Sequence, residues 1–352
     1  MKDVVLLIPV YNPTSKLIDL VKQLITSGYL KIIIVNDGSK KGKKIFERLK
    51  ETKECDVLEY NINRGKGYAL KYGINHYLLN YKTNFKGIIT TDCDLQHSLN
   101  DIINITLKLL GNLDSLIIGG RDFNLKDIPK LNQFGNKITA SIFNLLYGTK
   151  IKDTQTGLRG IPNRYLNLCL ETKGKRFEYE TNMLIKFTKQ KINIIEIPIE
   201  TIYYKNGKTY FNKIIDSIRI YQVIFSEYLK FLLSSLTCYS IDIVLFSILN
   251  NLFNTINSSL SIVFATILAR VIADFFNFNI NKHLVFDSHE SNKNILFKYY
   301  LLSISKMVSS ALCVLILHNL FGFINETIIK MLVDSTIYVI SYKIQKKYIF
   351  RT

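Results

Sequence analysis

The chain has 352 residues, of which 48% are apolar and only 21% are charged, and its formal net charge is +18. That length allows one sizeable domain plus a second, smaller unit, and the apolar excess is high for a wholly soluble protein. The five cysteines lack C-x-x-C spacing, which argues against a zinc site or a disulfide framework and fits a reducing cytosol. The basic charge suits phosphate-bearing substrates or anionic lipid headgroups. We do not expect nucleic acid as a partner, because no motif for it is present, and no internal repeat stands out.

Apolar segments that read as buried strands alternate with helix-like stretches along the first hundred residues. Residues 6–10 and 32–35 are two such strands, and they run into Tyr11-Asn12 and Asn36-Asp37. A basic glycine turn, Arg64-Gly65-Lys66, then leads into a helix. This alternation predicts an α/β fold with a mostly parallel sheet, and ligands of such sheets bind at the carboxyl ends of the strands.

Two carboxylates follow the next predicted strand, residues 87–90. Asp92 and Asp94 are separated by one residue, so in an extended segment both side chains point the same way. Like charges this close favour a cation between them, and carboxylate oxygens suit Mg²⁺ or Mn²⁺. Gln96 would add a third oxygen. The alternative is a polar loop at a strand end, where aspartate is common.

With these segments in place, the chain resembles the family 2 glycosyltransferases, which have the GT-A fold, a Rossmann-like, mostly parallel sheet with flanking helices. It is most similar to the polyprenyl-phosphate sugar synthases of the dolichyl-phosphate mannose synthase type. The resemblance covers roughly residues 3–225, because further motifs occur in the family's order: Gly119-Gly120-Arg121-Asp122, the segment from Asp153 to Arg159, the segment from Arg176 to Glu180, and residues 197–204.

The resemblance implies a donor site for a nucleotide-sugar. It places Pro9, Tyr11, Asn12 and Asp37 around the nucleoside, Arg64, Gly65 and Lys66 at the diphosphate, and Asp92, Asp94 and Gln96 at the metal. Two simpler interpretations stay open: Asp37 as a residue that caps a turn, and the turn at residues 64–66 as a basic surface loop.

For the acceptor, the resemblance implies polyprenyl phosphate. The second pKa of a phosphomonoester is about 6, so its oxygen can attack the anomeric carbon directly, with inversion and without a strong base. Arg121, Arg159 and Lys137 or Lys130 would bind this phosphate; an arginine often found in the family between residues 130 and 137 is absent. Asp153 would position these cations or sugar hydroxyls. The expected catalytic residues are Asp94, Arg121, Asp153 and Arg159. Glu178 and Glu180 either contact the sugar or lie on a solvated helix start, and His97 is expected to be structural.

The last third of the chain contains four long apolar stretches, at about 231–250, 258–280, 299–321 and 328–344. About 20 helical residues cross a hydrocarbon core of roughly 30 Å, and the fourth stretch is marginal. We therefore expect a cytoplasmic domain over 1–228, ending in an amphipathic helix along the membrane, and a transmembrane four-helix domain over 229–352. A soluble helical bundle is the alternative.

Lysine and arginine alternate between the connectors of these stretches, which predicts a multi-pass protein of the cell membrane with both termini in the cytoplasm. The span count and residues 275–286 resemble the GtrA-like membrane family, which is associated with polyprenyl-linked sugars. In the second stretch, Arg270 and Asp274 would either pair at i,i+4 or lie near the headgroups.

These features predict a membrane-bound inverting glycosyltransferase that moves one sugar from a UDP- or GDP-linked donor to undecaprenyl or dolichyl phosphate, for cell-surface glycan synthesis. A non-enzymatic carrier or flippase component, or a glycosyltransferase with another lipid or glycan acceptor, are the alternatives. A processive synthase typically carries Q-x-x-R-W, and this chain has no tryptophan. The bilayer is the expected partner, and a homo-oligomer is left open.

Overall fold

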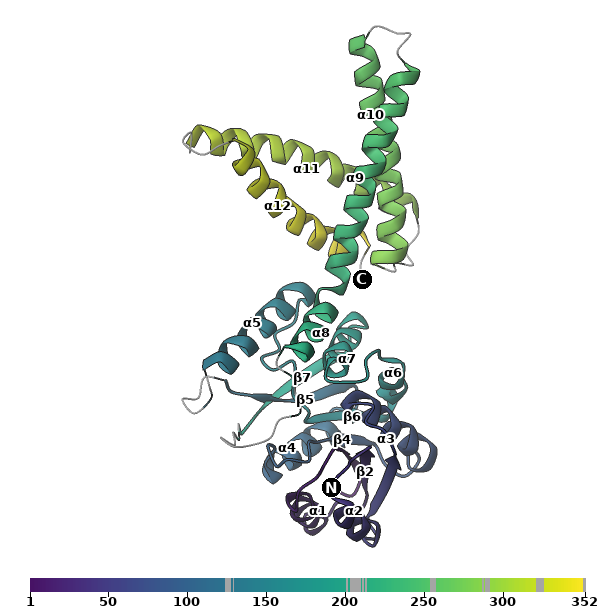
Figure 1. Ribbon diagram of the computed structural model, residues 1–352, viewed down its shortest axis with the longest axis vertical. Helices are drawn as coiled ribbons and strands as arrows, with labels where there is room; N and C mark the ends of the chain where they lie inside the picture. The colour runs from purple at the N-terminus through teal and green to yellow at the C-terminus, as the bar shows by residue number, and fades with distance from the viewer. Residues whose placement is uncertain are drawn as a thin grey trace. The chain divides into compact units, whose positions relative to one another are not determined.

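The computed structural model describes residues 1–123, 128, 130–200, 202, 210, 212, 214–253, 258–286, 288, 292–320 and 326–350. The chain forms two compact units, Met1–Ile224 and Phe225–Thr352 (Figure 1). The predicted closing segment at 197–204 lies mostly outside the described residues. The predicted domain boundary after residue 228 falls four residues beyond the limit between the units, and it stays a prediction.

The first unit is built on a seven-stranded sheet with the order β3-β2-β1-β4-β6-β5-β7. Only β6 runs antiparallel to its neighbours β4 and β5, and the other pairs are parallel. The predicted α/β class with a mostly parallel sheet is confirmed. The strands are β1 (Val4–Val10), β2 (Ile32–Asp37), β3 (Cys55–Tyr60), β4 (Gly87–Thr90), β5 (Ser115–Arg121), β6 (Arg159–Pro162) and β7 (Asn193–Ile199).

Alternation along the central strand explains why both faces of the sheet are covered. Val5 and Leu7 of β1 belong to one buried apolar cluster, and Leu6 and Ile8 belong to the other because successive side chains of a strand point to opposite faces. The cluster with Leu6 and Ile8 also contains buried side chains of three helices: α1 (Lys16–Thr26), α2 (Lys43–Lys50) and α4 (Leu99–Leu110). The cluster with Val5 and Leu7 contains buried side chains of five helices: α3 (Lys66–Asn80), α5 (Lys130–Tyr147), α6 (Leu166–Glu171), α7 (Glu178–Lys189) and α8 (Ile215–Ile224). The short 3₁₀ helix η1 (Asn163–Tyr165) precedes α6.

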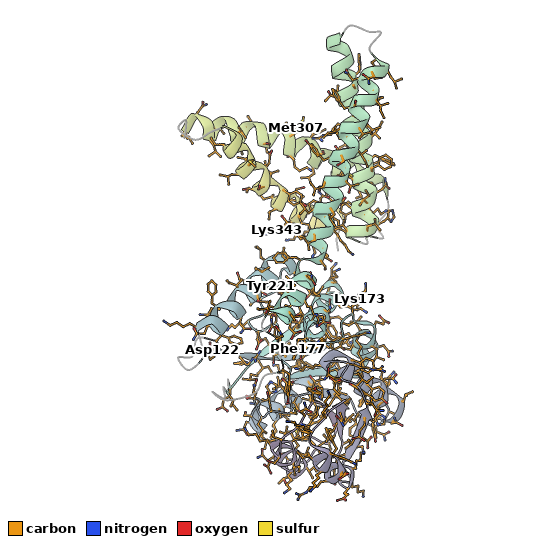
Figure 2. All side chains as sticks on the ribbon, in the orientation of Figure 1. Asp122, Lys173, Phe177, Tyr221, Met307 and Lys343 are labelled. Atoms are coloured by element: carbon orange, nitrogen blue, oxygen red, sulfur yellow. The ribbon has the colours of Figure 1, made fainter. Side chains whose placement is uncertain are left out.

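Helix α8 occupies part of the segment predicted as amphipathic, 210–228. Ile220 and Ile224 are buried in the core of the first unit, and the hydroxyls of Tyr221 and Thr139 on α5 lie 3.0 Å apart (Figure 2). Ile215 and Ile218 are exposed. The helix therefore keeps one apolar face for the core and shows apolar residues on another.

The second unit consists of two helical hairpins, and a short π-helix follows the second helix of each. The first is α9 (Ser226–Leu252), α10 (Ser258–Ile280) and η2 (Asn281–Val285); the second is α11 (Asn292–Leu320), α12 (Glu326–Ile344) and η3 (Gln345–Ile349) (Figure 1). Within the described residues, length and composition qualify one helix, α9, to cross a membrane.

Arg270 and Asp274 do not pair along α10, which removes the first of the two alternatives. Arg270 instead pairs with Asp242 of α9, with 3.0 Å between Nη1 and Oδ2. Asp274 accepts a 2.8 Å hydrogen bond from Ser303 of α11. Neighbouring helices supply these partners in place of the i,i+4 contact.

Candidate active site

The chain direction of the strands brings the predicted motifs to one edge of the sheet. Strand β1 runs parallel to both β2 and β4, and β5 runs in the same direction as β4 because both pair antiparallel with β6. The carboxyl ends of these four strands carry Asn12, Asp37, Asp92 and Arg121. Because β6 runs antiparallel, it begins where β4 ends, with Arg159 paired to Thr90. The segment 153–158 therefore reaches the same edge.

Lys66 joins two carboxylates at this edge. Its ammonium lies 2.7 Å from Asp92 and 2.9 Å from Glu180, which is buried at the start of α7. Burial alone would raise the pKa of Asp92, but the surrounding positive charge, foremost that of Lys66, and the hydrogen bond from Lys66 together outweigh it and bring the pKa to about 2. Asp92 is therefore a carboxylate over the whole physiological range, and Glu180 does not lie on a solvated helix start.

Gly157 allows the Lys66–Asp92 pair to form against the backbone. A Cβ added at this glycine would lie 2.5 Å from Asp92 Oδ2 and 2.7 Å from Lys66 Nζ. The carbonyl of Gly157 accepts a 2.7 Å hydrogen bond from Thr90, so the glycine is fixed beside β4. The site thus needs a residue without a side chain at this position.

Asp94 is the carboxylate next to this pair. Its Oδ1 accepts a 3.1 Å hydrogen bond from the backbone N–H of Gln96. Although Asp94 reaches solvent, the protein packed around it raises its pKa, and the charge of Asp92 adds to the effect. The neighbouring His97 is buried, with Nδ1 3.1 Å from Thr91 Oγ1, and burial lowers its pKa to about 4. That placement fits a structural histidine.

The Asp92–Asp94 pair fits a hard divalent cation. Two carboxylates with repelling charges face the same edge, and oxygen ligands are what Mg²⁺ and Mn²⁺ prefer. Gln96 contacts Asp94 through its backbone N–H and not through its side-chain oxygen. In the described ranges no cluster of three His, Cys, Asp or Glu side chains is present. The remaining ligands would have to come from the substrate and from water.

Arg121 and Asp153 form a two-pronged ion pair. Arg121 Nε lies 2.6 Å and Nη2 lies 3.2 Å from the two carboxylate oxygens of Asp153, which is fully buried. Glu196 of β7 holds the Asp153 amide at 2.8 Å. The charge of Arg121 also acts on Asp92, and the two residues therefore belong to one electrostatic site.

Arg159 is buried, in contrast to the expectation that it binds a phosphate. Its guanidinium donates to the carbonyls of Thr156 at 2.9 Å and Glu180 at 2.8 Å, and it lies 3.4 Å from the sulfur of Met183. Only 1% of the residue is exposed. Arg159 thus ties the segment 153–158 to α7, and it does not present its charge to a ligand.

We expect Arg159→Leu to lower the free energy of unfolding by about 3 kcal/mol, because two charge-assisted bonds to buried carbonyls are lost. Thermal unfolding followed by circular dichroism measures this. Arg164→Leu is the matched control, since it removes a guanidinium that lies over Tyr165 at the protein surface. An unfolding midpoint for Arg159→Leu equal to that of the control would contradict the structural role.

The interpretation of Asp37 as a turn-capping residue is the one the contacts support. Its carboxylate accepts hydrogen bonds from the backbone N–H of Arg64 at 2.7 Å, the N–H of Gly65 at 2.9 Å and the hydroxyl of Tyr60 at 2.8 Å. Gly65 has a φ of +98°, which favours glycine. The exposed Arg64 lies over the ring of Tyr68 at 4.8 Å. Asp37 therefore shapes the turn that delivers Lys66.

The first strand ends in a second fixed turn. Asn12 has a φ of +51°, and its side-chain oxygen accepts from the amides of Lys40 and Lys41 at 2.9 and 3.0 Å. Tyr11 packs edge-on against Tyr210, with 5.0 Å between the ring centroids, and Pro9 pairs with Val35 in the sheet. These residues form the edge of the site beside β2, where the family resemblance places the nucleoside.

The predicted acceptor lysines are not joined to this site. Lys130 and Lys137 are exposed on α5, and neither forms a hydrogen bond or ion pair with Arg121 or Asp153 in the described part of the chain. Glu178 Oε1 accepts from the amides of Lys175 and Arg176 and thus caps the start of α7. Sequence reasoning missed the links of Glu180 and Glu196 to the site, since both join motifs far apart in the chain.

The family follows from a comparison with known proteins. Residues 5–186, more than half of the chain, match the model of glycosyl transferase family 2, and the chain belongs to that family. Residues 230–350 match the GtrA/DPMS transmembrane domain. Both resemblances predicted from the sequence are confirmed, and the chain is a glycosyltransferase with a membrane domain.

Named relatives share parts of this organisation. The chain is 30% identical to a UDP-N-acetylglucosamine–dolichyl-phosphate N-acetylglucosaminyltransferase of Methanococcus voltae, over 57% of this chain and 86% of the relative. It is 28% identical to a dolichyl-phosphate hexose transferase of Haloferax volcanii, over 32% of this chain and 48% of the relative. A solved structure of glucosyl-3-phosphoglycerate synthase from Mycobacterium tuberculosis, in complex with Mn²⁺, UDP and glucosyl-3-phosphoglycerate, aligns with a TM-score of 0.49 at 12% identity, over 64% of this chain and 79% of that chain.

Proposed function

We propose that this chain transfers one sugar from a nucleotide-sugar to polyprenyl phosphate at the cytoplasmic face of a membrane, with inversion at the anomeric carbon. The observation that carries the proposal is one electrostatic site that combines the Asp92–Asp94 pair with the Arg121–Asp153 pair. The relatives named as dolichyl-phosphate transferases and the match to a transmembrane domain support a lipid acceptor.

On the donor side, Asp92 and Asp94 would hold Mg²⁺ or Mn²⁺, which supplies positive charge to the leaving nucleoside diphosphate. Without a donor, the ammonium of Lys66 neutralises the charge of Asp92. When a donor binds, this ammonium would turn to a phosphate oxygen while its contact with Glu180 keeps the side chain in place. The Asp37 carboxylate keeps the turn at Arg64 and Gly65 in the shape that presents Lys66.

On the acceptor side, no strong base is needed because a phosphomonoester with a second pKa of about 6 is already a nucleophile at neutral pH. Asp153 accepts hydrogen bonds from Arg121 and from the backbone N–H of Gln155, and its role is to orient the guanidinium. Arg121, with about a quarter of its side chain accessible, is the cation that can meet the phosphate. This assigns acceptor binding to Arg121 and leaves Arg159 as a positioning residue.

A panel of radiolabelled nucleotide-sugars tests the proposal. Membranes that contain the chain should convert one donor into label that extracts into organic solvent, and UDP-N-acetylglucosamine is the first donor to try. Membranes with Asp94→Asn serve as the control. Label that stays in the aqueous phase with every UDP- and GDP-linked donor would contradict the proposal.

We expect Arg121→Gln to raise the apparent KM for polyprenyl phosphate at least about tenfold, because one charge-assisted contact to phosphate is worth roughly 1.5–3 kcal/mol. The KM for the donor should stay within about twofold of the wild-type value, and initial-rate kinetics measure both. Lys137→Gln, on exposed α5, is the control and should leave both constants unchanged. If the donor KM rises instead, Arg121 serves the nucleotide.

We also propose four membrane spans with both termini in the cytoplasm. In a Cys313→Ser background, a cysteine placed at Asn254 should react with a membrane-impermeant thiol reagent in intact cells, and a cysteine at the exposed Lys347 should react only after permeabilisation. Labelling of the Lys347 position in intact cells would mean that the number of spans is odd.

A further inference from the structure

Lys66 connects one of the proposed metal ligands to a second buried carboxylate. We define Lys66, Asp92 and Glu180 as the lysine bridge. The ammonium lies 2.7 Å from Asp92 Oδ1 and 2.9 Å from Glu180 Oε1, and only 15% of the lysine side chain and 4% of the Glu180 side chain are accessible. Because the three groups are shielded from water, their contacts are screened far less than those of a surface ion pair.

The lysine of the bridge is charged. Burial alone would lower the pKa of Lys66, but the charges of Asp92 and Glu180 and the hydrogen bonds to them raise this pKa above its ordinary value. Burial raises the pKa of Glu180, and the charge of Lys66 opposes that rise. At Asp92, the ammonium therefore takes the place of the positive charge that a divalent cation would supply.

Two glycines place the backbone of Lys66 directly against the segment that leads into α7. A Cβ added at Gly65 would lie 2.5 Å from the carbonyl oxygen of Lys175, and one added at Gly67 would lie 2.5 Å from Cβ of Tyr179. The path of the chain on both sides of Lys66 is thus fixed by close contacts. Any movement of the ammonium away from the metal ligand has to come from rotation of the four-carbon side chain.

Both oxygens of Asp92 are closely packed. Oδ1 faces Lys66, and Oδ2 lies 2.5 Å from the position that a Cβ of Gly157 would take. A cation at Asp92 would have to lie beside the ammonium, and two positive charges at one carboxylate repel each other. Asp94, the other proposed ligand, is exposed. A single carboxylate is a poor site for a cation such as Mg²⁺, which prefers an octahedral set of oxygens.

We propose that Lys66 keeps the divalent cation off Asp92 until a nucleoside diphosphate is bound, so that the cation and the diphosphate enter and leave the site together; this rests on the function proposed above. The diphosphate offers the ammonium oxygens with more negative charge than one carboxylate, and Lys66 turns to them. Asp92 then becomes available to the cation. Glu180 is a positioning residue, because its carboxyl group stays in contact with the ammonium in both arrangements.

The same exchange gives the lysine bridge a role after sugar transfer. When the nucleoside diphosphate leaves, Lys66 returns to Asp92 and displaces the cation from it. A cation that stayed on Asp92 and Asp94 would attract the acceptor phosphate into the empty donor site, because both lie at one edge of the sheet. The bridge thus prevents an unproductive complex of cation and acceptor in the absence of a donor.

This exchange is measurable as a coupling between two ligands. If the diphosphate raises the affinity for the cation by a given factor, the cation raises the affinity for the diphosphate by the same factor. Lys66 opposes the cation only while no diphosphate is bound. We therefore expect the lysine to supply at least about tenfold of the coupling, a size within the usual range for coupled sites.

Binding of Mn²⁺ to the purified full-length chain tests the proposal without turnover. Electron paramagnetic resonance of free Mn²⁺ gives the dissociation constant without nucleotide and with saturating UDP or GDP, each corrected for Mn²⁺ that the nucleotide binds by itself. The wild-type chain should bind Mn²⁺ at least about tenfold more tightly with one of the two nucleotides. Lys66→Met should bind Mn²⁺ alone at least about tenfold more tightly than the wild type, and its nucleotide dependence should fall by a similar factor.

Lys71→Met is the matched control, because Lys71 lies on the same helix and its ammonium lies over the ring of Tyr179, 5.1 Å from the ring centroid. It should bind Mn²⁺ as the wild type does. Lys66→Met leaves Glu180 buried without its lysine, so Lys66→Met combined with Glu180→Gln is the second variant. The double variant should show the same gain in Mn²⁺ affinity, and it decides the test if the single variant unfolds.

Equal Mn²⁺ affinity of the wild-type chain with and without either nucleotide would overturn the proposal. So would Lys66 variants that bind Mn²⁺ alone no more tightly than the wild type, or an equal gain in Lys71→Met. The outcome is distinct from that of the proposed function. A chain that shows the coupling but makes no lipid-linked sugar would refute the function alone, and a chain that makes lipid-linked sugar without the coupling would refute only the role of the lysine bridge.

Discussion

Asp94→Asn should lower the turnover number by roughly 10²–10³-fold, the scale found when one preorganised electrostatic contact to developing charge is removed. Asparagine keeps the shape of the side chain but removes the negative charge that, with Asp92, is proposed to hold the divalent cation. Steady-state kinetics at saturating donor and thermal unfolding measure the two quantities. The unfolding midpoint should not fall, because Asp94 reaches solvent and its pKa is raised, first by burial and then by the charge of Asp92, so its ionised form does not stabilise the fold.

Asp19→Asn is the matched control, since Asp19 is an exposed aspartate in the first turn of α1. It should leave turnover unchanged. Near-normal activity of Asp94→Asn, or full activity of the wild type in excess EDTA, would falsify the metal assignment.

Gly157→Ala should reduce turnover by about 100-fold, the loss that a misplacement of roughly 1 Å at a reacting site produces. The added methyl group would lie 2.5 Å from Asp92 Oδ2 and 2.7 Å from Lys66 Nζ, so the ion pair must separate or the segment 153–158 must shift. Kinetic assays and the affinity for the nucleoside diphosphate, measured by calorimetry, should both show the change.

Gly135→Ala is the control for this substitution. Gly135 lies in α5 with open space around the position of a Cβ, and alanine should add about 0.5–1 kcal/mol of helix stability without a change in turnover. Equal turnover in Gly157→Ala and Gly135→Ala would mean that the Lys66–Asp92 contact does not shape the catalytic site.

Much of the first unit could be predicted from the sequence because local patterns determine it. Apolar strands with polar ends alternate with helical stretches, and the rule that ligands bind at the carboxyl ends of strands places Asp37, Asp92 and Arg121 at one edge. The identity of each partner could not be predicted. Lys66 reaches Glu180 across more than a hundred residues, and Arg159 turns inward to main-chain carbonyls, because tertiary packing alone decides which groups a side chain meets.

The membrane unit shows a different limit of sequence reasoning. Its two hairpins repeat weakly in sequence, since residues 251–257 recur at 319–325 with five of seven positions identical. The repeat is hidden because the offset changes from 68 to 64 residues between the helices of a hairpin and because apolar helices share few distinctive residues. The stacked pair Phe286 and Phe350 and the bonded pair Asn281 and Gln345 make the relation visible. The partner of Arg270, Asp242, could not be predicted for the same reason, since a helix pattern alone does not show which neighbouring helix lies closest.

The most direct measurement of the central claim uses the purified chain, the donor that labels membranes, and two lipids that differ only in their headgroup, polyprenyl phosphate and polyprenol. Mass spectrometry of the lipid fraction should show polyprenyl phosphate heavier by one sugar residue, and polyprenol unchanged. Sugar on polyprenol, sugar released only to water, or more than one sugar per lipid would contradict transfer of a single sugar to a lipid phosphate.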